Sequence, residues 1–368
     1  MNKRVLILGA SAVQLDAVLQ LKKMGCQTYV CAMAKDGPAA YAADNFEEIN
    51  ILDKEKVTNY IMANKIDIVY SVGSDLAIPM ACSISEQLGL PHFVSANTAF
   101  VCNRKNYMRE TLSNRCKGNI PFQVMEVPET IKIDFPVILK PSDSQGQRGI
   151  YLVNSQQEME KHFYEAKDYS REGKVIVEKY ICGQEYSVNG YMVNGKIRYL
   201  VPTLRETWPE YVGLIHKHVI TKDLLSTNVR EKIISIAENA CMLLGIQNGP
   251  VYFQMKIEED SPYIIEVTPR LDGCHMWNLL MRATGINLMK LCFEHLLYNN
   301  TSELNNIFNE IKDMELVFYC QEPNTEMDKS KFLEPDDVLD LFYYYKTGDY
   351  IREVNGVYEK VGYFIRNL

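Results

Sequence analysis

The sequence predicts a mixed fold of the α/β and α+β classes, with an open parallel sheet in its N-terminal part. Three observations lead to this prediction. Short apolar runs alternate with helical periodicity over residues 1–93, which is typical of βαβ units. A smaller α+β unit is expected over about residues 118–182, and long β segments fill much of residues 185–268.

The composition of the chain favours a globular enzyme and argues against a nucleic-acid-binding or membrane-spanning protein. The chain has 368 residues, 47% of them hydrophobic and 23% charged, which is ordinary for a globular enzyme built from two or three units. The net charge is -8 and basic residues form no cluster, so nucleic acid is not expected as a partner. No apolar run approaches the ~18 residues that cross a membrane. The cysteines are scattered without a C-x-x-C pair, which predicts a cytoplasmic protein with reduced thiols.

The N-terminal elements alternate between strand and helix. Strands are expected at Val5–Leu8, Thr28–Ala32, Ile49–Ile51 and Ile66–Val72, and helices at Ala12–Lys23, Lys54–Asn64 and Leu76–Leu88. Gly9 is the only glycine after the first strand, so the G-x-G-x-x-G pattern is lacking and a Rossmann-type dehydrogenase is rejected. Ser74 and Asp75 follow the fourth strand, where they are expected to contact a ligand or to cap the next helix.

The later elements are longer and less regular. Helices are expected at Ala96–Ser113, Gln156–Tyr169, Arg230–Leu244 and from Met276 onward. Strands are expected at Phe135–Leu139, Gly149–Val153, Val175–Glu178, Tyr186–Met192, Lys196–Thr203, Val251–Ile257, Tyr263–Val267, Leu316–Gln321 and Val361–Ile365. The dipeptide Leu90-Pro91 marks the expected boundary between the first unit and the rest of the chain.

Residues 135–150, FPVILKPSDSQGQRGI, indicate a triphosphate site. An apolar strand ends in Lys140, whose ammonium can bind phosphate oxygens, and a loop of small and polar residues follows. Glycines in this loop allow the backbone to approach a phosphate closely. The chain has no G-x-x-x-x-G-K-[ST] motif, so this is not a Walker A loop, and an ordinary surface hairpin is the alternative. The candidate loop residues are Ser142, Ser144, Gln145, Gly146 and Gly149.

Two other segments are compatible with a nucleotide site. Lys105 lies on a predicted helix upstream, where a lone lysine is usually a solvated side chain. In VIVEKYICGQEY, a strand runs into Glu178, and Lys179 to Ile181 form an extended hinge whose backbone can bind adenine. Glu185 can accept hydrogen bonds from ribose hydroxyls. A strand–turn–strand with solvated carboxylates is the alternative.

A predicted hairpin, VYFQMKIEEDSPYIIEVTPR, indicates a magnesium site. Its polar turn places Gln254 and Glu266 side by side on one face, and oxygen ligands from adjacent strands suit Mg²⁺. Arg270 follows four residues after Glu266, within reach of a phosphoryl group or a carboxylate. Asp272 and His275 are expected either to contact a substrate or to cap the helix that begins near Met276.

The motifs follow one another in the order found in the ATP-grasp superfamily, and the chain resembles this superfamily over nearly its whole length. It is most similar to the branch of carbamoyl phosphate synthetase-like enzymes and carboxylate–amine ligases. The resemblance implies a pre-ATP-grasp βαβ domain at residues 1–93. A two-lobed ATP-grasp fold would then cover residues 94–300, with a small lid subdomain at about 118–182, and a C-terminal extension at 301–368 would pack on the grasp core.

The resemblance also implies roles for the nucleotide-site residues. Lys105 and Lys140 would hold the α- and β-phosphates, and the loop from Ser142 to Gly149 would close over the triphosphate. Glu178, Lys179 and Ile181 would contact adenine, mainly through the hinge backbone, and Glu185 would contact the ribose.

The implied metal is one or two Mg²⁺ ions, with Mn²⁺ as a possible replacement. Gln254 and Glu266 would hold it, and Arg270 would act with Lys140 as a catalytic residue by stabilising the transferred phosphoryl group. Thr268 stands where the family usually has Asn. A hydroxyl is a less certain metal ligand than an amide oxygen, so a second Mg²⁺ is in question.

The function that follows is ATP-dependent formation of an amide-type bond from a small carboxylate and an amine, through an acyl phosphate and with release of ADP. Arg205, His216 and His218 are candidates for binding the acid or for accepting a proton from the amine, and surface hairpin residues are the alternative. The competing functions are an ATP-dependent carboxylase or carboxylate kinase and a non-catalytic ATP-binding regulatory module. A homodimer is expected from the resemblance.

Overall fold

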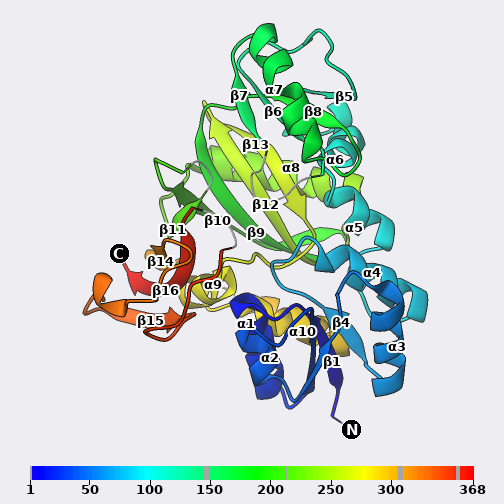
Figure 1. The fold of residues 1–368 in the computed structure, drawn as a ribbon, viewed down its shortest axis with the longest axis vertical. Coiled ribbons are helices and arrows are strands. Elements are labelled where there is room, and N and C mark those ends of the chain that lie inside the picture. Colours follow the sequence, from blue (N-terminus) through cyan, green and yellow to red (C-terminus); the bar gives the residue numbers. More distant parts are fainter. Residues whose placement is uncertain (1, 144–148, 212–213, 306–309, 354–356) are drawn as a thin grey trace.

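Three β-sheets form the framework of the protein in the computed structural model (Figure 1). The structure describes residues 2–143, 149–211, 214–305, 310–353 and 357–368. A parallel sheet near the N-terminus lies at one end of the molecule, a small antiparallel sheet lies at the other end, and a long antiparallel sheet lies between them. The mixture of parallel and antiparallel sheets confirms the predicted fold class.

The N-terminal sheet is fully parallel, as predicted, in the order β3-β2-β1-β4. Its strands are β1 (Arg4–Leu8), β2 (Gln27–Ala32), β3 (Asn45–Glu48) and β4 (Ile68–Tyr70), and the helices are α1 (Ala12–Lys23), α2 (Pro38–Ala42), α3 (Lys54–Asn64) and α4 (Ala77–Leu88). The strand predicted at Ile49–Ile51 was wrong, because β3 ends at Glu48. Ile49 is buried, but the Asn50 side chain accepts from the Leu52 amide and turns the chain there.

The single helix predicted over Ala96–Ser113 was also wrong. The chain forms α5 (Ala96–Cys102), α6 (Lys105–Leu112) and a 3₁₀ turn, η1 (Ser113–Arg115). Arg104 is extended between the two helices, with φ -123° and ψ 116°. The Lys105 amide donates to the Ser142 carbonyl at 3.1 Å, so this break places the start of α6 beside the end of a strand of the small sheet.

The small sheet has the order β5-β8-β6-β7 and is covered by one helix. Its elements are β5 (Phe122–Met125), β6 (Val137–Pro141), β7 (Tyr151–Val153), α7 (Gln156–Asp168) and β8 (Val175–Lys179). Met159 and Phe163 of α7 are buried in one core cluster with Val137 and Leu139. Strand β5 has no counterpart among the predicted elements.

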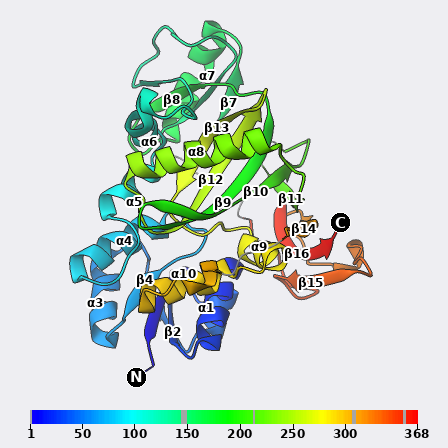
Figure 2. The ribbon, with the colours of Figure 1, turned by 180° about the vertical axis from the view of Figure 1, so that it is seen from behind.

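The long sheet has eight strands in the order β13-β12-β9-β10-β11-β14-β16-β15. They are β9 (Gln184–Val193), β10 (Lys196–Thr207), β11 (Ile215–Ile220), β12 (Gly249–Glu258), β13 (Ser261–Thr268), β14 (Met314–Gln321), β15 (Val338–Tyr343) and β16 (Glu359–Asn367). Helix α8 (Thr227–Leu244) crosses one face of the sheet (Figure 2). The last three strands join this sheet through β11 and β14. The boundaries proposed at residues 93 and 300 stay predictions.

Three further features complete the fold. Helices α9 (Met276–Thr284) and α10 (Leu288–Tyr298) follow β13, α10 packs on α1, and the 3₁₀ turns η2 (Ser302–Asn305) and η3 (Lys329–Lys331) lie in later connections. All ten cysteines are free thiols, and eight of them are buried. Among the described residues, no helix has both the length and the apolar character needed to span a membrane.

The N-terminal sheet touches the loop after β13 at a pair of glycines. The Gly73 amide donates to the Leu271 carbonyl at 3.3 Å. A Cβ atom at Gly73 would lie 2.4 Å from the Cα atom of Gly273. The contact is between backbone atoms, which cannot rotate away as a flexible side chain can. No side chain therefore fits between the two segments.

Replacement of Gly73 by alanine tests this contact, and Gly89 provides a matched control. Both have positive φ, +64° and +66°, but nothing lies within 4 Å of a Cβ at Gly89. Gly89→Ala is expected to cost about 1–2 kcal/mol for the left-handed backbone. Gly73→Ala is expected to cost about 1–3 kcal/mol more, because the backbones must separate. Urea denaturation measures both, and equal losses would contradict the close approach.

Candidate functional site

The strand-end lysine is part of a buried group of charged side chains. Lys140 Nζ donates to Glu178 Oε2 at 2.6 Å, and Arg109 Nε donates to Glu178 Oε1 at 2.9 Å. Each of the three residues is at most 5% exposed. Arg109 also donates to the carbonyl of Ile264 at 2.7 Å, so it connects β8 with β13. One carboxylate therefore binds two cations from different parts of the fold and leaves the group with one net positive charge.

The pKa values follow from this arrangement. Burial works against the charged form of Glu178, but the charges of Arg109 and Lys140 outweigh it and lower the pKa of Glu178 to about 2. Burial lowers the pKa of Lys140, and the neighbouring Glu178 opposes that change. Glu178 is therefore an anion at neutral pH whose main contacts in this structure are protein cations.

The loop after Lys140 is held to the end of α7. Ser142 is fully buried, and its amide donates to the Lys174 carbonyl at 3.1 Å. The carboxylate of Asp143 accepts from Ser170 Oγ at 2.8 Å and from the Arg171 amide at 3.0 Å. Gly149 has a φ of +71°, and a Cβ there would meet the Tyr169 ring at 2.7 Å. Ser144, Gln145 and Gly146 lie outside the described residues.

Among the described residues, the hinge from Lys179 to Ile181 has one backbone amide without an acceptor. The amide of Lys179 donates to the Pro121 carbonyl at 3.0 Å, and that of Tyr180 donates to the Pro136 carbonyl at 3.1 Å. The amide of Cys182 donates to the Glu258 carboxylate at 2.6 Å. The amide of Ile181 has no acceptor among the described residues. Ile181 is therefore the hinge position best placed to donate to a ligand.

Glu185 lies at the start of β9 and contacts two candidate residues. Its Oε1 atom forms an ion pair with Arg205 of β10 and accepts from Gln254 Nε2 of β12 at 2.6 Å. The structure thus brings together residues predicted for the ribose, the substrate and the metal. They gather on neighbouring strands of the long sheet.

The predicted hairpin is present with the expected register. Gln254 of β12 pairs directly with Glu266 of β13, and a turn with positive φ at Glu259 and Asp260 joins the strands. Thr268 Oγ1 is buried and has no hydrogen-bond partner within the described part of the chain. An amide, a carboxylate and an unpartnered hydroxyl are oxygen donors that fit Mg²⁺.

The candidate metal ligands are too few for a metal ion that is bound by protein side chains alone. In the described ranges, no group of three or more His, Cys, Asp or Glu side chains could hold an ion. Gln254, Glu266 and Thr268 supply a single carboxylate. This composition fits an ion that takes its remaining ligands from water and from phosphate oxygens.

Arg270 is buried beside the hairpin and is paired with the N-terminal unit. Its Nη2 atom lies 2.6 Å from Asp75 Oδ1, and its Nε atom donates to the same oxygen at 2.7 Å. Burial disfavours the charged form, but Asp75 and Asp272 outweigh it and raise the pKa of Arg270. Neither Ser74 nor Asp75 is the N-cap of the following helix, because Leu76 occupies that position, although the Ser74 Oγ accepts from the Ala77 amide at 3.2 Å.

The two histidines predicted for substrate contact differ in environment. His218 is fully buried, neither ring nitrogen has a partner in the described residues, and burial lowers its pKa well below the usual range. His216 is half-buried, and its Nε2 atom lies 3.9 Å from Glu206. Burial also lowers the pKa of His216. Of these two histidines, only His218 is buried without a partner in the described residues, and it is the direct cross-strand neighbour of Arg205.

Asp272 and His275 do not cap α9 through their side chains. The Asp272 Oδ1 atom accepts from the Cys274 amide at 3.3 Å, while Oδ2 is buried and has no partner among the described residues. His275 occupies the N-cap position with a φ of 54°, and its side chain makes no capping bond. The capping alternative was therefore wrong, because each side chain is turned to other groups.

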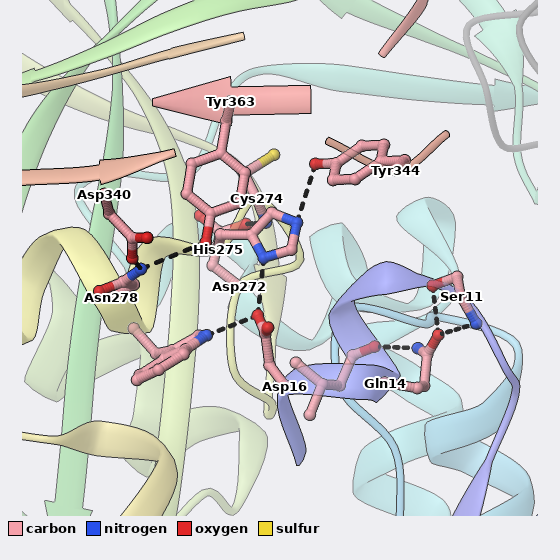
Figure 3. Close-up of polar contacts among 12 residues, drawn as sticks. Ser11, Gln14, Asp16, Asp272, Cys274, His275, Asn278, Asp340, Tyr344 and Tyr363 are labelled. Atoms are coloured by element: carbon pink, nitrogen blue, oxygen red, sulfur yellow. Dashed lines mark hydrogen bonds and ion pairs between the residues drawn. The ribbon is translucent and has the colours of Figure 1, made fainter. Parts of the chain in front are cut away.

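The His275 ring links three parts of the chain (Figure 3). Its Nδ1 atom lies 2.6 Å from Asp16 Oδ2 of α1, and its Nε2 atom lies 2.8 Å from the Tyr344 hydroxyl. The ring stacks on Tyr363 of β16 with centroids 4.4 Å apart. With both nitrogens bound to protein, His275 acts as a structural link rather than as a free substrate ligand.

Comparison with known proteins agrees with this geometry. Residues 133–277 match the model of the ATP-grasp domain. The chain carries an ATP-grasp domain. The match begins just before β6 and ends inside α9, so it includes Lys140, the hinge, the hairpin and Arg270.

The ATP-grasp relatives are distant in sequence. The chain is 22% identical over 343 residues to the carbamoyl phosphate synthase large chain of Clostridium beijerinckii, covering 86% of this chain and 31% of that protein. It therefore spans about a third of the length of this relative. Among solved structures, phosphoribosylglycinamide synthetase from Anaerococcus prevotii aligns with a TM-score of 0.80 and 20% identity, covering 100% of this chain and 94% of that one. The L-amino acid ligase from Bacillus licheniformis aligns with a TM-score of 0.81 and 17% identity, covering 99% and 93%.

Two residues near the ATP-grasp motifs were missed by the sequence analysis. Arg109 lies four residues after Lys105 on α6, one helical turn away, and this spacing was a usable signal. Lys360 comes from β16, far along the chain, and its Nζ atom lies 3.3 Å from Cys274 Sγ. No motif near Lys360 indicates this position, since only the order of the long sheet brings it there.

Proposed function

We propose that the protein is an ATP-dependent carboxylate–amine ligase that forms an amide-type bond and releases ADP and phosphate. One observation carries the proposal: Arg109 connects the Lys140–Glu178 pair to the carbonyls of Ile264 and Ile265, immediately before Glu266. The positive strand end and the oxygen-rich hairpin of the ATP-grasp domain are thus joined by one buried side chain. Such a combination suits a nucleotide whose phosphates meet cations on one side and a metal on the other.

The nucleotide would lie between the small sheet and the long sheet. Lys105 and Lys140 would bind the phosphates, and Ser142 and Gly149 would also contact them. The amide of Ile181, which has no acceptor among the described residues, would donate to adenine beside Glu178 and Lys179. Glu185 would accept from the ribose through Oε2, because its contacts with Arg205 and Gln254 use Oε1 in the described part of the chain.

Gln254, Glu266 and Thr268 would hold Mg²⁺ together with the phosphates. The bound ion would offset the negative charge of the triphosphate. Whether Thr268 supports a second ion, and whether Mn²⁺ can replace Mg²⁺, are parts of the proposal that metal titration can decide.

The reaction would proceed in two balanced steps. An oxygen of the substrate carboxylate attacks the γ-phosphorus, the bond from that phosphorus to the β–γ bridging oxygen breaks, and ADP leaves. The amine nitrogen then attacks the acyl carbon, the carbon–oxygen bond to phosphate breaks, and the nitrogen loses a proton. Arg270 would stabilise charge on the transferred phosphoryl group, and the uncharged His218 could accept the proton.

Product analysis tests the proposal. The protein is incubated with Mg·ATP, a panel of carboxylates, and hydroxylamine as a small general amine. Release of ADP that depends on a carboxylate, together with a hydroxamate, is the expected result, because hydroxylamine traps an acyl phosphate. Formation of AMP and pyrophosphate would mean adenylation and would overturn the mechanism. ADP release that depends on bicarbonate would favour a carboxylase, and ATP binding without turnover would favour a regulatory module.

A further inference from the structure

We propose that Lys360, Arg205 and Asp272 form a subsite for a zwitterionic acid, in which a carboxylate and an ammonium group bind opposite charges. This inference rests on the proposed ligase function and names the class of acid that it would use. The residues come from β16, from β10 and from the loop after β13. The α-amino acids are the simplest compounds with this pair of charges.

The first observation is a continuous set of contacts around these residues. Lys360 Nζ lies 3.3 Å from Cys274 Sγ and 3.8 Å from the centroid of the Phe318 ring. The Cys274 amide donates to Asp272 Oδ1 at 3.3 Å. Cys274 therefore contacts both Asp272, through its amide, and Lys360, through its sulfur atom. Asp272 and Cys274 lie on the loop beside the His275 ring in Figure 3.

The second observation connects this set to Arg205 and His218. The His218 and Phe318 rings have centroids 6.4 Å apart, so the Phe318 ring neighbours both His218 and the ammonium of Lys360. Arg205 and His218 are direct partners on β10 and β11. The charges of Arg270, Arg205 and Lys360 all act on Asp272, opposing the rise in its pKa that burial causes.

The third observation is that several buried polar atoms here have no protein partner. In the described part of the chain, these atoms are Asp272 Oδ2, Arg205 Nε, and both ring nitrogens of His218. The three residues are at most 8% exposed. A buried polar atom without a hydrogen bond costs free energy, so such a cluster is typical of a site whose partner is a ligand.

The charges within the cluster specify the ligand. Arg270 is paired with Asp75, and Arg205 with Glu185 through Nη1, which leaves Nε unpartnered. Lys360 forms no ion pair with a carboxylate in the described residues, and Asp272 forms none with a cation. Lys360 and Asp272 thus each lack an oppositely charged group in direct contact within the described residues, although cations act on Asp272 from a distance. A carboxylate bound at Lys360 and Arg205, with an ammonium bound at Asp272, would satisfy both.

The wild-type protein provides the first test, by calorimetry with Mg²⁺ and a non-hydrolysable ATP analogue. The probes are α-amino acids, each paired with the carboxylic acid that lacks its amino group. At least one amino acid is expected to bind ten-fold or more tightly than its pair, because a hydrogen bond between charged groups is lost in the plain acid. Equal binding of the two members, or binding of plain acids alone, would overturn the subsite. Failure of every probe to bind would also overturn it.

Variants separate the two charges. Asp272→Asn is expected to abolish the preference for the amino acid while the plain acid binds as before. Lys360→Met is expected to weaken both members of a pair about equally, by ten-fold or more. Lys329→Met is the matched control, because Lys329 also lies over an aromatic ring, at 4.4 Å from the Tyr343 centroid, and is expected to change neither affinity. A preference that survives Asp272→Asn in a protein with normal thermal unfolding would contradict the assignment.

ADP release with the same probes separates this inference from the proposed function. Amino acids that bind with the expected variant effects but cause no ADP release would refute the ligase function and leave the subsite standing. ADP release with plain acids, and none with amino acids, would support the ligase and refute the subsite.

Discussion

Replacement of Glu178 by glutamine is expected to lower the free energy of unfolding by about 3–5 kcal/mol. Glu178 is 3% exposed and binds both Arg109 and Lys140. A neutral amide would leave two buried cations without a counterion, which costs far more than the pair itself contributes. Nucleotide affinity is expected to fall as well, since Lys140 would lose the carboxylate that holds its position.

Glu172→Gln is the matched control for this prediction. Glu172 pairs with Arg104 at 2.6 Å, but both side chains are about a quarter exposed, so the variant is expected to lose roughly 1 kcal/mol or less. Urea denaturation compares the two variants. If the two variants lose similar free energy of unfolding, the charged group around Glu178 contributes less to stability than its burial implies.

The same group predicts how stability depends on pH. The pKa of Glu178 falls from 4.5 to about 2 on folding, so its contribution is present above pH 4.5 and is lost as pH falls toward 2. The shift corresponds to ~3 kcal/mol. Glu178→Gln is therefore expected to be less stable at neutral pH and to lose less further stability between pH 4.5 and 2. An unchanged acid dependence in the variant would contradict the low pKa.

Arg270→Ala is expected to reduce kcat for acid-dependent ADP release by about 10²–10³, the usual loss when one positioned stabilising donor is removed. The guanidinium lies beside the hairpin of Gln254 and Glu266 and is held by Asp75. This position suits a cation that stabilises charge on the transferred phosphoryl group. The binding of ATP is expected to change much less than kcat.

Asp75→Asn distinguishes this role from a structural one. The Arg270–Asp75 pair joins the grasp domain to the loop after β4, so its loss alone could disturb the site. Asp75→Asn removes the ion pair but keeps the guanidinium, and it is expected to reduce kcat by ten-fold or less. An equal reduction of kcat in Arg270→Ala and Asp75→Asn would mean that Arg270 acts through its ion pair with Asp75 and not by stabilising the phosphoryl group.

Local patterns were sufficient for much of the fold. Helices α1 and α3 have the predicted bounds, because apolar periodicity and flanking polar residues define them within a short stretch. The pairing of Gln254 with Glu266 was also predictable, since a short hairpin fixes its register through its turn. The binding roles of these residues stay predictions.

Long-range contacts account for what the sequence could not predict. The break before Lys105 depends on a hydrogen bond to the Ser142 carbonyl, which no local pattern reveals. The spacing of Arg109 from Lys105 indicated a shared helix face, but its contacts with Glu178 and Ile264 come from distant strands and could not be predicted. Lys360 reaches the site only because β16 pairs with β14, and β14 with β11. His275 was expected at a substrate or a helix cap, but Asp16 and Tyr344 occupy its ring.

The strand order of the long sheet has a consequence for how the protein folds. The small sheet that carries Lys140 and Glu178 uses residues 122–179 alone, whereas β11 must find β14 by bringing positions 219 and 315 together. Closing a long loop costs entropy before any contact compensates for it, so pairings between distant segments form slowly. The strand end that we propose to bind phosphate can therefore form early. Lys360 takes its place beside Cys274 only once the last strands have joined, so under our proposals a partly folded chain would bind nucleotide before it could select an acid.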